Sequence, residues 1–394
     1  MRVLALTQIF PNAAEPLSAP FNRQQLSELG HLCALEVVAP VPWFPGAGWA
    51  ARWSAAGRRG RVPRREVIED LAVAHPRALY VPRVGRSLSA GLYAASVARE
   101  VLSRRGQMDV LLATWAYPDG CAAVVLARLL GVPAVVKLHG SDLNVTAKLA
   151  GPRAQLARLL PAASRVIAVS RPLADEAIRL GVAPERVRVV PNGVDRARFS
   201  PADRQAARAG LGLAPERRLL LYVGHLKEAK GAVDLARAYT LLAAERGDVD
   251  LLVVGDGEAK GAMTAVAEQS GEGGRGMRLV GARPYDEVPR WMAAADVIVL
   301  PSWNEGTPNT IIEALAAGRR VIATPVGGIP DLVTSPLLGE LVPPRDVGAL
   351  AAALARAVDE PYDPSAVAAA AAEGQGSWAD SAARLLRVLE EVVG

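Results

Sequence analysis

The sequence predicts an α/β protein of two domains, each with a parallel sheet covered by helices. Its 394 residues are too many for one ordinary core and suit two domains of this class. Short apolar runs alternate with helical segments along the chain, which is the pattern of parallel strands joined by helical crossovers. Aromatic residues make up only 5% of the chain, while alanine and arginine are abundant. This composition favours helices that cover sheets over an all-β fold.

The first half of the chain is expected to form a domain over residues 1–195. Its strands are expected at residues 3–6, 36–41, 110–113, 134–138, 166–169 and 187–190. Its helices are expected from near Asn22, over 90–104 and 120–130, and after Ser170. The segment PNGVDRARFSP follows the last of these strands, and its turn formers and prolines indicate a linker between domains.

The second half is expected to form a domain over residues 196–376, followed by a terminal helical segment over 377–394. Strands are expected at residues 219–223, 251–254, 278–280, 297–300 and 321–323, and helices at 259–269, 286–295, 308–317 and 379–392. The last helix carries Leu385, Leu386 and Leu389 as an apolar stripe suited to docking on another surface.

The stretch DVIVLPSWNEGTPNTIIEALAAGRRVIATPVGGIPD organises the second half. It predicts a buried strand, a polar loop, a helix that begins at Pro308, and a further strand. Backbone N–H groups at such a helix start, near Asn309 and Thr310, favour an anion such as phosphate. Glu305 lies in the loop and Glu313 in the helix, and carboxylates are more suitable acceptors for sugar hydroxyls than partners for phosphate.

Three motifs together resemble retaining GT-B glycosyltransferases of family 4. The first is EGTPNTIIEALAAG, in which seven residues separate Glu305 from Glu313. The others are the HGSD element at 139–142 and GHLKEAKG at 224–231. The early FPN and PFNRQQ segments look most like the branch that includes teichuronic acid and other cell-surface polysaccharide glycosyltransferases. The resemblance implies two Rossmann-like domains that face each other across a cleft. It also implies that the C-terminal helix crosses back to the first domain.

The resemblance also implies roles for particular residues. His139, Lys230 and Glu305 would be the catalytic residues: Lys230 would neutralise the leaving diphosphate, Glu305 would accept hydroxyls of the donor sugar, and His139 would line the sugar pocket. Glu313 would accept the ribose hydroxyls. The full set expected to bind the donor is Gly224, His225, Lys230, Gly255, Arg283, Glu305, Gly306, Pro308, Asn309, Thr310 and Glu313.

This chain departs from the family pattern at two places. His225 stands where the family has an arginine, and a neutral imidazole offers one N–H where arginine offers a charged fork. A phosphate beside His225 would favour the imidazolium, so donor binding would weaken as pH rises. The loop after the first strand has Pro11, Pro16 and Pro20 where most family members have two adjacent glycines.

The function expected from these observations is retaining transfer of a sugar from a UDP- or GDP-sugar to a hydroxyl of a polysaccharide, glycan or lipid-linked acceptor. The alternatives are another GT-B activity, such as an epimerase or phosphorylase, and a non-catalytic protein that binds nucleotide sugars. We expect no cofactor and no bound metal. Asp248 and Asp250 form the D-x-D motif of metal-dependent glycosyltransferases, but they precede their strand and so lie at the sheet edge opposite the expected site. No motif residue stands out as a nucleophile, which agrees with a front-face route in which the leaving phosphate accepts the acceptor's proton.

Composition and termini favour a cytoplasmic protein that is soluble or peripheral to the inner face of the cytoplasmic membrane. The N-terminus lacks the features of a signal peptide, and Cys33 and Cys121 have no metal-binding spacing. The net charge of +5 suits an anionic ligand, membrane or nucleic acid alike. Residues 43–65 combine tryptophans with arginines, which suits contact with lipid headgroups or the acceptor, or alternatively a long loop that packs locally. No nucleic-acid-binding module accompanies the segment, so we expect no nucleic acid partner.

Overall fold

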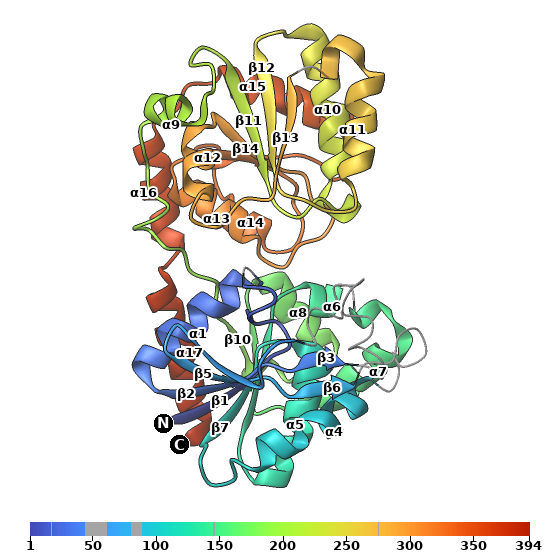
Figure 1. The fold of residues 1–394 in the computed structure, drawn as a ribbon, viewed down its shortest axis with the longest axis vertical. Coiled ribbons are helices and arrows are strands. Elements are labelled where there is room, and N and C mark those ends of the chain that lie inside the picture. The colour runs from blue at the N-terminus through green and yellow to red at the C-terminus, as the bar shows by residue number, and fades with distance from the viewer. Residues whose placement is uncertain (17, 44–60, 80–88, 145, 275) are drawn as a thin grey trace. The chain divides into compact units, whose positions relative to one another are not determined.

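The computed structural model describes residues 1–16, 18–43, 61–79, 89–144, 146–274 and 276–394. The chain divides into two compact units (Figure 1). Unit 1 comprises Met1–Asn192 with Trp378–Gly394, and unit 2 comprises Gly193–Ser377. Each unit contains a sheet of mainly or wholly parallel strands with helices beside it, so the expected α/β class is confirmed.

Unit 1 is built on an eight-stranded sheet with the order β10-β9-β8-β7-β1-β2-β5-β4. All neighbouring strands are parallel except β4, which runs antiparallel to β5 at the sheet edge. A separate parallel pair is formed by β3 and β6. The strands are β1 (Arg2–Leu6), β2 (Ala34–Val38), β3 (Val41–Trp43), β4 (Arg65–Ile68), β5 (Leu71–Ala74), β6 (Arg77–Leu79), β7 (Val110–Ala113), β8 (Ala134–Leu138), β9 (Arg165–Ala168) and β10 (Val187–Val189).

The helices of unit 1 connect these strands and cover the sheet. They are α1 (Pro20–Leu32), α4 (Ser89–Leu102), α5 (Cys121–Leu130), α6 (Ser141–Asn144), α7 (Ala150–Leu159), α8 (Arg171–Arg179) and α17 (Trp378–Val393). Short one-turn segments are η1 (Ala116–Gly120), η2 (Thr146–Lys148), η3 (Leu160–Ala162) and η4 (Pro184–Arg186).

Central strands of unit 1 such as β1 and β7 are apolar on both faces because helices cover both sides of the sheet. Along β1, Leu4 and Leu6 belong to one buried cluster, whereas Val3 and Ala5 belong to another. Successive side chains of a strand point to opposite faces, so an uninterrupted apolar run supplies both cores.

The C-terminal helix α17 belongs to unit 1 and packs against α1 (Figure 1). Leu385 and Leu389 are fully buried in the core that also contains Leu26 and Leu29 of α1, and Leu386 is partly buried against it. The expected return of the last helix to the first domain is therefore confirmed, and the apolar stripe provides the contact.

Unit 2 is built on a six-stranded, wholly parallel sheet with the order β13-β12-β11-β14-β15-β16. Its strands are β11 (Arg218–Val223), β12 (Val249–Val254), β13 (Met277–Gly281), β14 (Val297–Leu300), β15 (Arg320–Ala323) and β16 (Gly339–Leu341). Its helices are α9 (Arg204–Leu211), α10 (Ala232–Glu245), α11 (Lys260–Gln269), α12 (Val288–Ala294), α13 (Asn309–Ala316), α14 (Ile329–Leu332), α15 (Val347–Asp359) and α16 (Pro364–Gly374), with one-turn segments η5 (Glu228–Lys230) and η6 (Gly271–Gly274).

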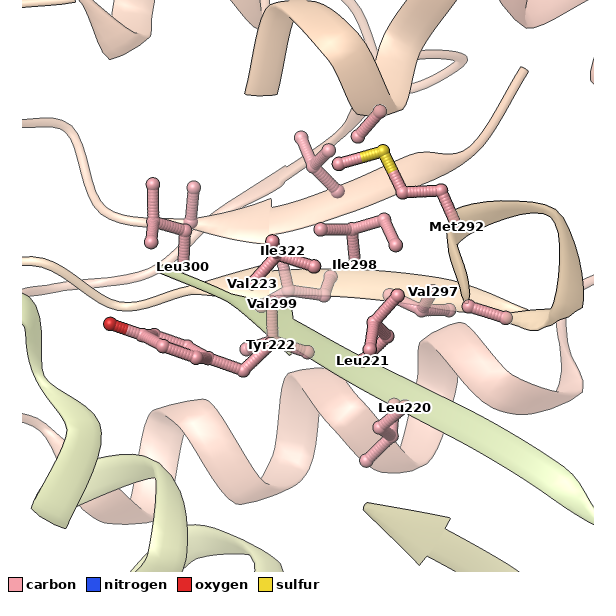
Figure 2. Packing of buried hydrophobic residues seen from close by; sticks show 14 of the residues in the cluster. Leu220, Leu221, Tyr222, Val223, Met292, Val297, Ile298, Val299, Leu300 and Ile322 are labelled. Carbon is pink, nitrogen blue, oxygen red and sulfur yellow. The ribbon is translucent and has the colours of Figure 1, made fainter. Parts of the chain in front are cut away.

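The centre of unit 2 is the pair of neighbouring strands β11 and β14. Figure 2 shows their side chains in one apolar cluster together with Met292 and Ile322. Tyr222 lies in this cluster, and its hydroxyl donates to the carbonyl of His225 over 3.0 Å. The bond ties the end of β11 to the loop that follows, so the core fixes where that loop begins.

The structure differs from the sequence expectation at several elements, which include β16, α9, α10 and α16 as well as those that follow. The strands β4, β5 and β6 lie in a stretch for which no strand was expected, because β4 has no continuous apolar run and pairs only at an exposed edge. Helix α7 was not expected either. Helix α13 begins at Asn309, and Pro308 occupies the position before its first turn without a side-chain hydrogen bond.

Candidate functional site

The strand order of unit 2 creates a switch point between β11 and β14. The chain runs from β11 outward to β13 on one side, and from β14 outward to β16 on the other. In open α/β sheets, ligands bind beyond the carboxyl ends of the strands at such a point. The segment after β11 carries Lys230 and the segment after β14 carries Glu305, so the two converge here.

Lys230 and Glu305 form an ion pair at this switch point. The ammonium Nζ of Lys230 lies 2.6 Å from Oε2 of Glu305, and their side chains are 32% and 7% exposed. The hydroxyl of Ser302 donates to the other carboxylate oxygen over 2.7 Å. Thr324 in turn donates to the carbonyl of Ser302. Glu305 is therefore held from two sides, which fixes its carboxylate for a directed contact.

The start of α13 lies beside the end of β11. The hydroxyl of Thr310 donates to the carbonyl of Val223 over 3.2 Å, and the amide of Gly328 donates to the carbonyl of Gly306 over 2.6 Å. Since Pro308 offers no side-chain acceptor to the first turn, backbone N–H groups and the helix dipole at Asn309 and Thr310 suit an anion.

Glycines allow the loops of this region to approach closely. A Cβ on Gly255 would lie 1.8 Å from the carbonyl oxygen of Gly224. Gly231 has a φ of +68°, and a Cβ there would lie 2.0 Å from the carbonyl oxygen of Pro301. Both positions therefore require glycine, and both also have a positive φ that other residues rarely adopt.

A hollow of about 600 Å³ opens beside these loops. Among its lining residues are Gly224, His225, Gly255 and Arg283, which the sequence analysis had assigned to donor binding. Asp256 and Gly257, which directly follow Gly255 in the same loop, also line it. The volume lies within the range of ligand pockets.

Two side chains that line the hollow, those of His225 and Arg283, have neighbours of their own. The His225 side chain is 56% exposed, and its Nδ1 lies 3.8 Å from Oε2 of Glu258. The guanidinium of Arg283 lies 5.9 Å from the ring centroid of Trp291 and donates to the carbonyl of Val280. Contact with the aromatic ring orients Arg283 without neutralising its charge.

Glu313 is buried and paired with a tyrosine. Burial raises the pKa of its carboxyl to about 7, and the hydrogen bond from the Tyr285 hydroxyl acts in the opposite direction. That hydroxyl donates to Oε1 over 2.8 Å. Tyr285 packs on Phe199, and the guanidinium of Arg198 lies 5.3 Å from its ring centroid. Sequence analysis missed Tyr285, because its link to Glu313 spans 28 positions and leaves no local pattern.

His139 belongs to unit 1 and lies in an aromatic setting. Its ring centroid is 4.8 Å from that of Phe21 and 6.0 Å from that of Trp115, which stacks on it. Burial, with a smaller contribution from Lys137, lowers the pKa of His139 well below its usual value. Its buried Nε2 has no hydrogen-bond partner among the described residues. His139 is thus a neutral imidazole.

Asp142 shapes the loop that holds His139. Its carboxylate accepts the amides of Ala116 at 3.0 Å, Gly140 at 2.7 Å and His139 at 3.2 Å. The carboxylate is fully buried. The geometry therefore gives Asp142 a positioning role rather than a simple capping role.

Lys137 lies within the core of unit 1. Its ammonium donates to Gln25 and, over 3.4 Å, to Oδ1 of Asn192. Burial lowers the pKa of this lysine to about 7. Gln25 donates to Ser381 of α17 over 2.7 Å, so the polar contacts connect the sheet, α1 and the last helix.

Several expectations concern metals, membranes and the segment at 43–65. Within the described ranges, no three His, Cys, Asp or Glu side chains gather in a way that could hold a metal ion. Asp248 is paired with Arg246, and Asp250 with Arg217. No helix in the described part of the chain is long and apolar enough to span a bilayer. Most of the 43–65 segment, residues 44–60, lies outside the described residues.

Comparison with known proteins identifies the family of this chain. Residues 217–360 match the model described as "Glycosyl transferases group 1", and residues 41–198 match "Glycosyltransferase Family 4". A Bacillus subtilis (strain 168) protein, provisionally named teichuronic acid biosynthesis glycosyltransferase TuaC, is 32% identical over 90% of this chain and 89% of its own length. The chain belongs to glycosyltransferase family 4. The family 4 glycosyltransferase described here is also 34% identical to D-inositol 3-phosphate glycosyltransferase 1 of Catenulispora acidiphila, over 79% of this chain and 77% of that protein.

Solved structures confirm the GT-B fold. Anabaena Alr3699/HepE in complex with UDP and glucose aligns with a TM-score of 0.75 and 19% identity, covering 99% of this glycosyltransferase and all of that chain. Sucrose-phosphate synthase from Thermosynechococcus elongatus aligns with a TM-score of 0.74 and 20% identity, covering 99% of both chains. At these identities the likeness shows the fold alone.

Proposed function

We propose that this family 4 glycosyltransferase transfers a hexose from a UDP-sugar to a hydroxyl of a polysaccharide, glycan or lipid-linked acceptor, with retention at the anomeric carbon. The observation that carries the proposal is the Lys230–Glu305 ion pair at the switch point of unit 2. The backbone N–H groups at the start of α13 lie at the same edge of the sheet. The name of the TuaC relative supports a polysaccharide acceptor, and the UDP and glucose bound to Alr3699/HepE support a uridine nucleotide.

In this proposal unit 2 binds the donor. Lys230 and the start of α13, at Asn309 and Thr310, stabilise the negative charge that develops on the leaving diphosphate. Glu305 accepts hydroxyls of the donor sugar, for which its fixed carboxylate is well suited. Glu313 accepts the ribose hydroxyls. The hollow beside His225 and Arg283 takes the nucleoside end.

Unit 1 binds the acceptor in the same proposal, and His139 lines the sugar pocket. A neutral imidazole suits this task, because its free nitrogen accepts or donates a hydrogen bond without adding charge. The leaving phosphate accepts the proton of the attacking hydroxyl on the same face of the sugar. The reaction requires no metal, since Lys230 supplies the positive charge. We place the protein in the cytoplasm at the inner membrane face, where a lipid-linked acceptor would lie.

A thermal-shift screen in EDTA tests the donor. The full chain is heated with UDP, GDP, ADP or their sugar conjugates. A ligand at about 100 times its Kd stabilises the folded state by about 2.7 kcal/mol, or roughly 5–10 °C for a unit of this size. We expect UDP and a UDP-hexose to raise the melting temperature. Glu313→Ala should lose the shift, whereas Glu287→Ala, at an exposed position of the same unit, should keep it.

Product analysis then tests transfer. Incubation with the UDP-sugar and an acceptor glycan should yield an α-linked product from an α-linked donor, as NMR of the anomeric proton will show. A shift with GDP alone would change the donor assignment. Binding without hydrolysis or transfer would instead support a non-catalytic nucleotide-sugar-binding protein.

A further inference from the structure

Unit 1 contains a second hollow, of about 230 Å³, that none of the proposed roles uses. It lies where several chain segments leave the carboxyl ends of the strands in unit 1, the edge at which α/β sheets bind ligands. Residues that line it include Gln8, Pro40, Pro42, Leu79, Pro118 and Leu149.

The lining of this hollow is mostly apolar. Among the described residues, prolines and leucines make up most of the lining, and Tyr93 adds an aromatic ring. The hydroxyl of Tyr93 donates to the buried carboxylate of Asp119, which does not itself line the hollow. The hydroxyl is thus engaged elsewhere, and the ring is the part of Tyr93 that remains to face a ligand. The amide nitrogen of Gln8 likewise donates to the carbonyl of Tyr117 over 3.3 Å.

Apolar side chains also remain exposed around the hollow. Leu149 lines it and is 39% exposed. Trp43 is paired with the lining residue Leu79 in the β3–β6 ladder and is 38% exposed. Large apolar side chains that stay in water beside an apolar hollow are typical of a ligand site.

The volume limits what can bind. An apolar cavity of about 150 Å³ holds one benzene molecule, and sites that enclose a whole drug-sized ligand measure about 300–1,000 Å³. A hollow of 230 Å³ therefore has room for a compact hydrocarbon group and not for a complete glycosyl acceptor. A sugar ring would also need several polar partners. The side chains of Gln8 and Tyr93, two of the four polar residues in the lining, already donate hydrogen bonds within unit 1.

We propose that the hollow in unit 1 is a subsite for a hydrocarbon group of about six to ten carbons carried by the acceptor. The inference rests on the proposed function, because it adds to acceptor recognition by unit 1. The hydrocarbon is either the part of a lipid carrier next to its head group or the apolar aglycone of a soluble acceptor. Both sources share the chemistry that the lining recognises.

A series of alkyl β-D-glucosides from butyl to dodecyl tests the subsite. Binding to the full chain is measured by calorimetry, below the concentration at which each glucoside forms micelles. Each methylene that enters an apolar site strengthens binding by about fourfold. We expect the Kd to fall with each added methylene up to roughly the octyl or decyl glucoside. For longer alkyl chains the Kd should stay constant, because the hollow is then full. A Kd that keeps falling with length would mean adsorption to an open surface and would overturn the proposal, as would no binding.

Two substitutions check the location. Leu149 stands at the N-cap of α7, where aspartate is a favoured residue, so Leu149→Asp should fold while adding a charge to the lining. We expect it to weaken decyl glucoside binding at least tenfold. The matched control is Leu129→Asp, at a leucine that is 59% exposed on α5 and does not line the hollow. Ala78→Leu fills part of the lining, so the Kd should stop falling at an alkyl chain about three carbons shorter than in the wild type. Equal effects of Leu149→Asp and Leu129→Asp would overturn the assignment.

The two sources are separated by two further probes. Tighter binding of citronellyl phosphate than of citronellyl β-D-glucoside, which carries the same hydrocarbon, would identify a lipid carrier, and the reverse order would identify an aglycone. The UDP-induced thermal shift is measured in all variants as a separate control. If UDP still shifts the melting temperature and no alkyl glucoside binds, the subsite is wrong and the donor proposal stands. If alkyl glucosides bind and no nucleotide does, the subsite holds and the donor proposal fails.

Discussion

The ammonium of Lys230 donates to Oε2 of Glu305 over 2.6 Å, although 75 positions separate the two residues in the chain. The pair joins the segment after β11 to the segment after β14, which are neighbours in the sheet. One partner is the cation that we assign to the diphosphate, and the other is the carboxylate that we assign to the donor sugar. Each residue therefore positions the other before any ligand arrives.

Replacement of Lys230 by alanine should sharply reduce transfer. It removes the proposed diphosphate cation and leaves the carboxylate of Glu305, whose side chain is 7% exposed, without its ionic partner. Losing one member of such a pair costs about 2–5 kcal/mol, which we expect to see in kcat/KM with the UDP-sugar. Lys227→Ala, at an exposed position of the same loop, serves as the control and should keep its activity. Normal turnover by Lys230→Ala would refute the assignment.

Replacement of His225 by arginine should tighten donor binding. Arginine restores the residue of the family pattern and offers a charged fork, where a neutral imidazole offers one N–H. Since the His225 side chain is more than half exposed, we expect a gain in UDP affinity of about threefold to tenfold. Calorimetry with UDP measures the gain, and Glu258, an acidic neighbour of His225, is tested separately. Equal UDP affinities of the wild type and His225→Arg would exclude a diphosphate contact at this position.

Glu313 should make the stability of unit 2 depend on pH. Its pKa rises from 4.5 to about 7 on folding, so the native state binds more protons than the unfolded state between these values. Stability then falls as pH rises through this window, by about 3 kcal/mol in all. Glu313→Gln cannot titrate and should lose this contribution. We measure the free energy of unfolding in urea at pH 5 and pH 8. The wild type should lose more stability between these pH values than Glu313→Gln does, and Glu287→Gln should behave like the wild type. Parallel pH profiles for wild type and Glu313→Gln would contradict the assignment.

Gly231→Ala should destabilise unit 2 more than Gly212→Ala does. Both glycines have left-handed backbones, with φ of +68° and +66°. A left-handed alanine costs about 1–2 kcal/mol at either position. At Gly231 the new Cβ would also lie 2.0 Å from the Pro301 carbonyl oxygen, whereas nothing lies within 4 Å at Gly212. We expect a further loss of at least about 2 kcal/mol at Gly231 in denaturant unfolding, together with reduced activity. Equal losses would mean that the Pro301 segment can move aside.

The elements around the switch point could be predicted because their signals are local. The apolar run of β14 and the glycine after α13 lie within a few residues of the structures that they specify. The family resemblance also implied that Gly224, His225, Gly255 and Arg283 belong to one site, and the structure places them around one hollow. Whether that site binds the donor stays a prediction.

Other features could not be predicted because their cause lies far away in the chain. The strand β4 forms only because β5 offers it an antiparallel edge. The contacts of Asp142 could not be read from its local sequence either. In the structure its carboxylate accepts the amide of Ala116, which lies 26 positions earlier.

By itself, the sequence determined the α/β class, the family and the order in which candidate site residues follow their strands, because hydrophobic periodicity, turn residues and motif spacing act over short distances. Only the tertiary structure decided the chemical state of those residues. It joined Lys230 to Glu305, surrounded His139 with Phe21 and Trp115, and buried Glu313 against Tyr285. Charge and pKa depend on solvent and on partners brought in from distant segments, and no local pattern contains that information.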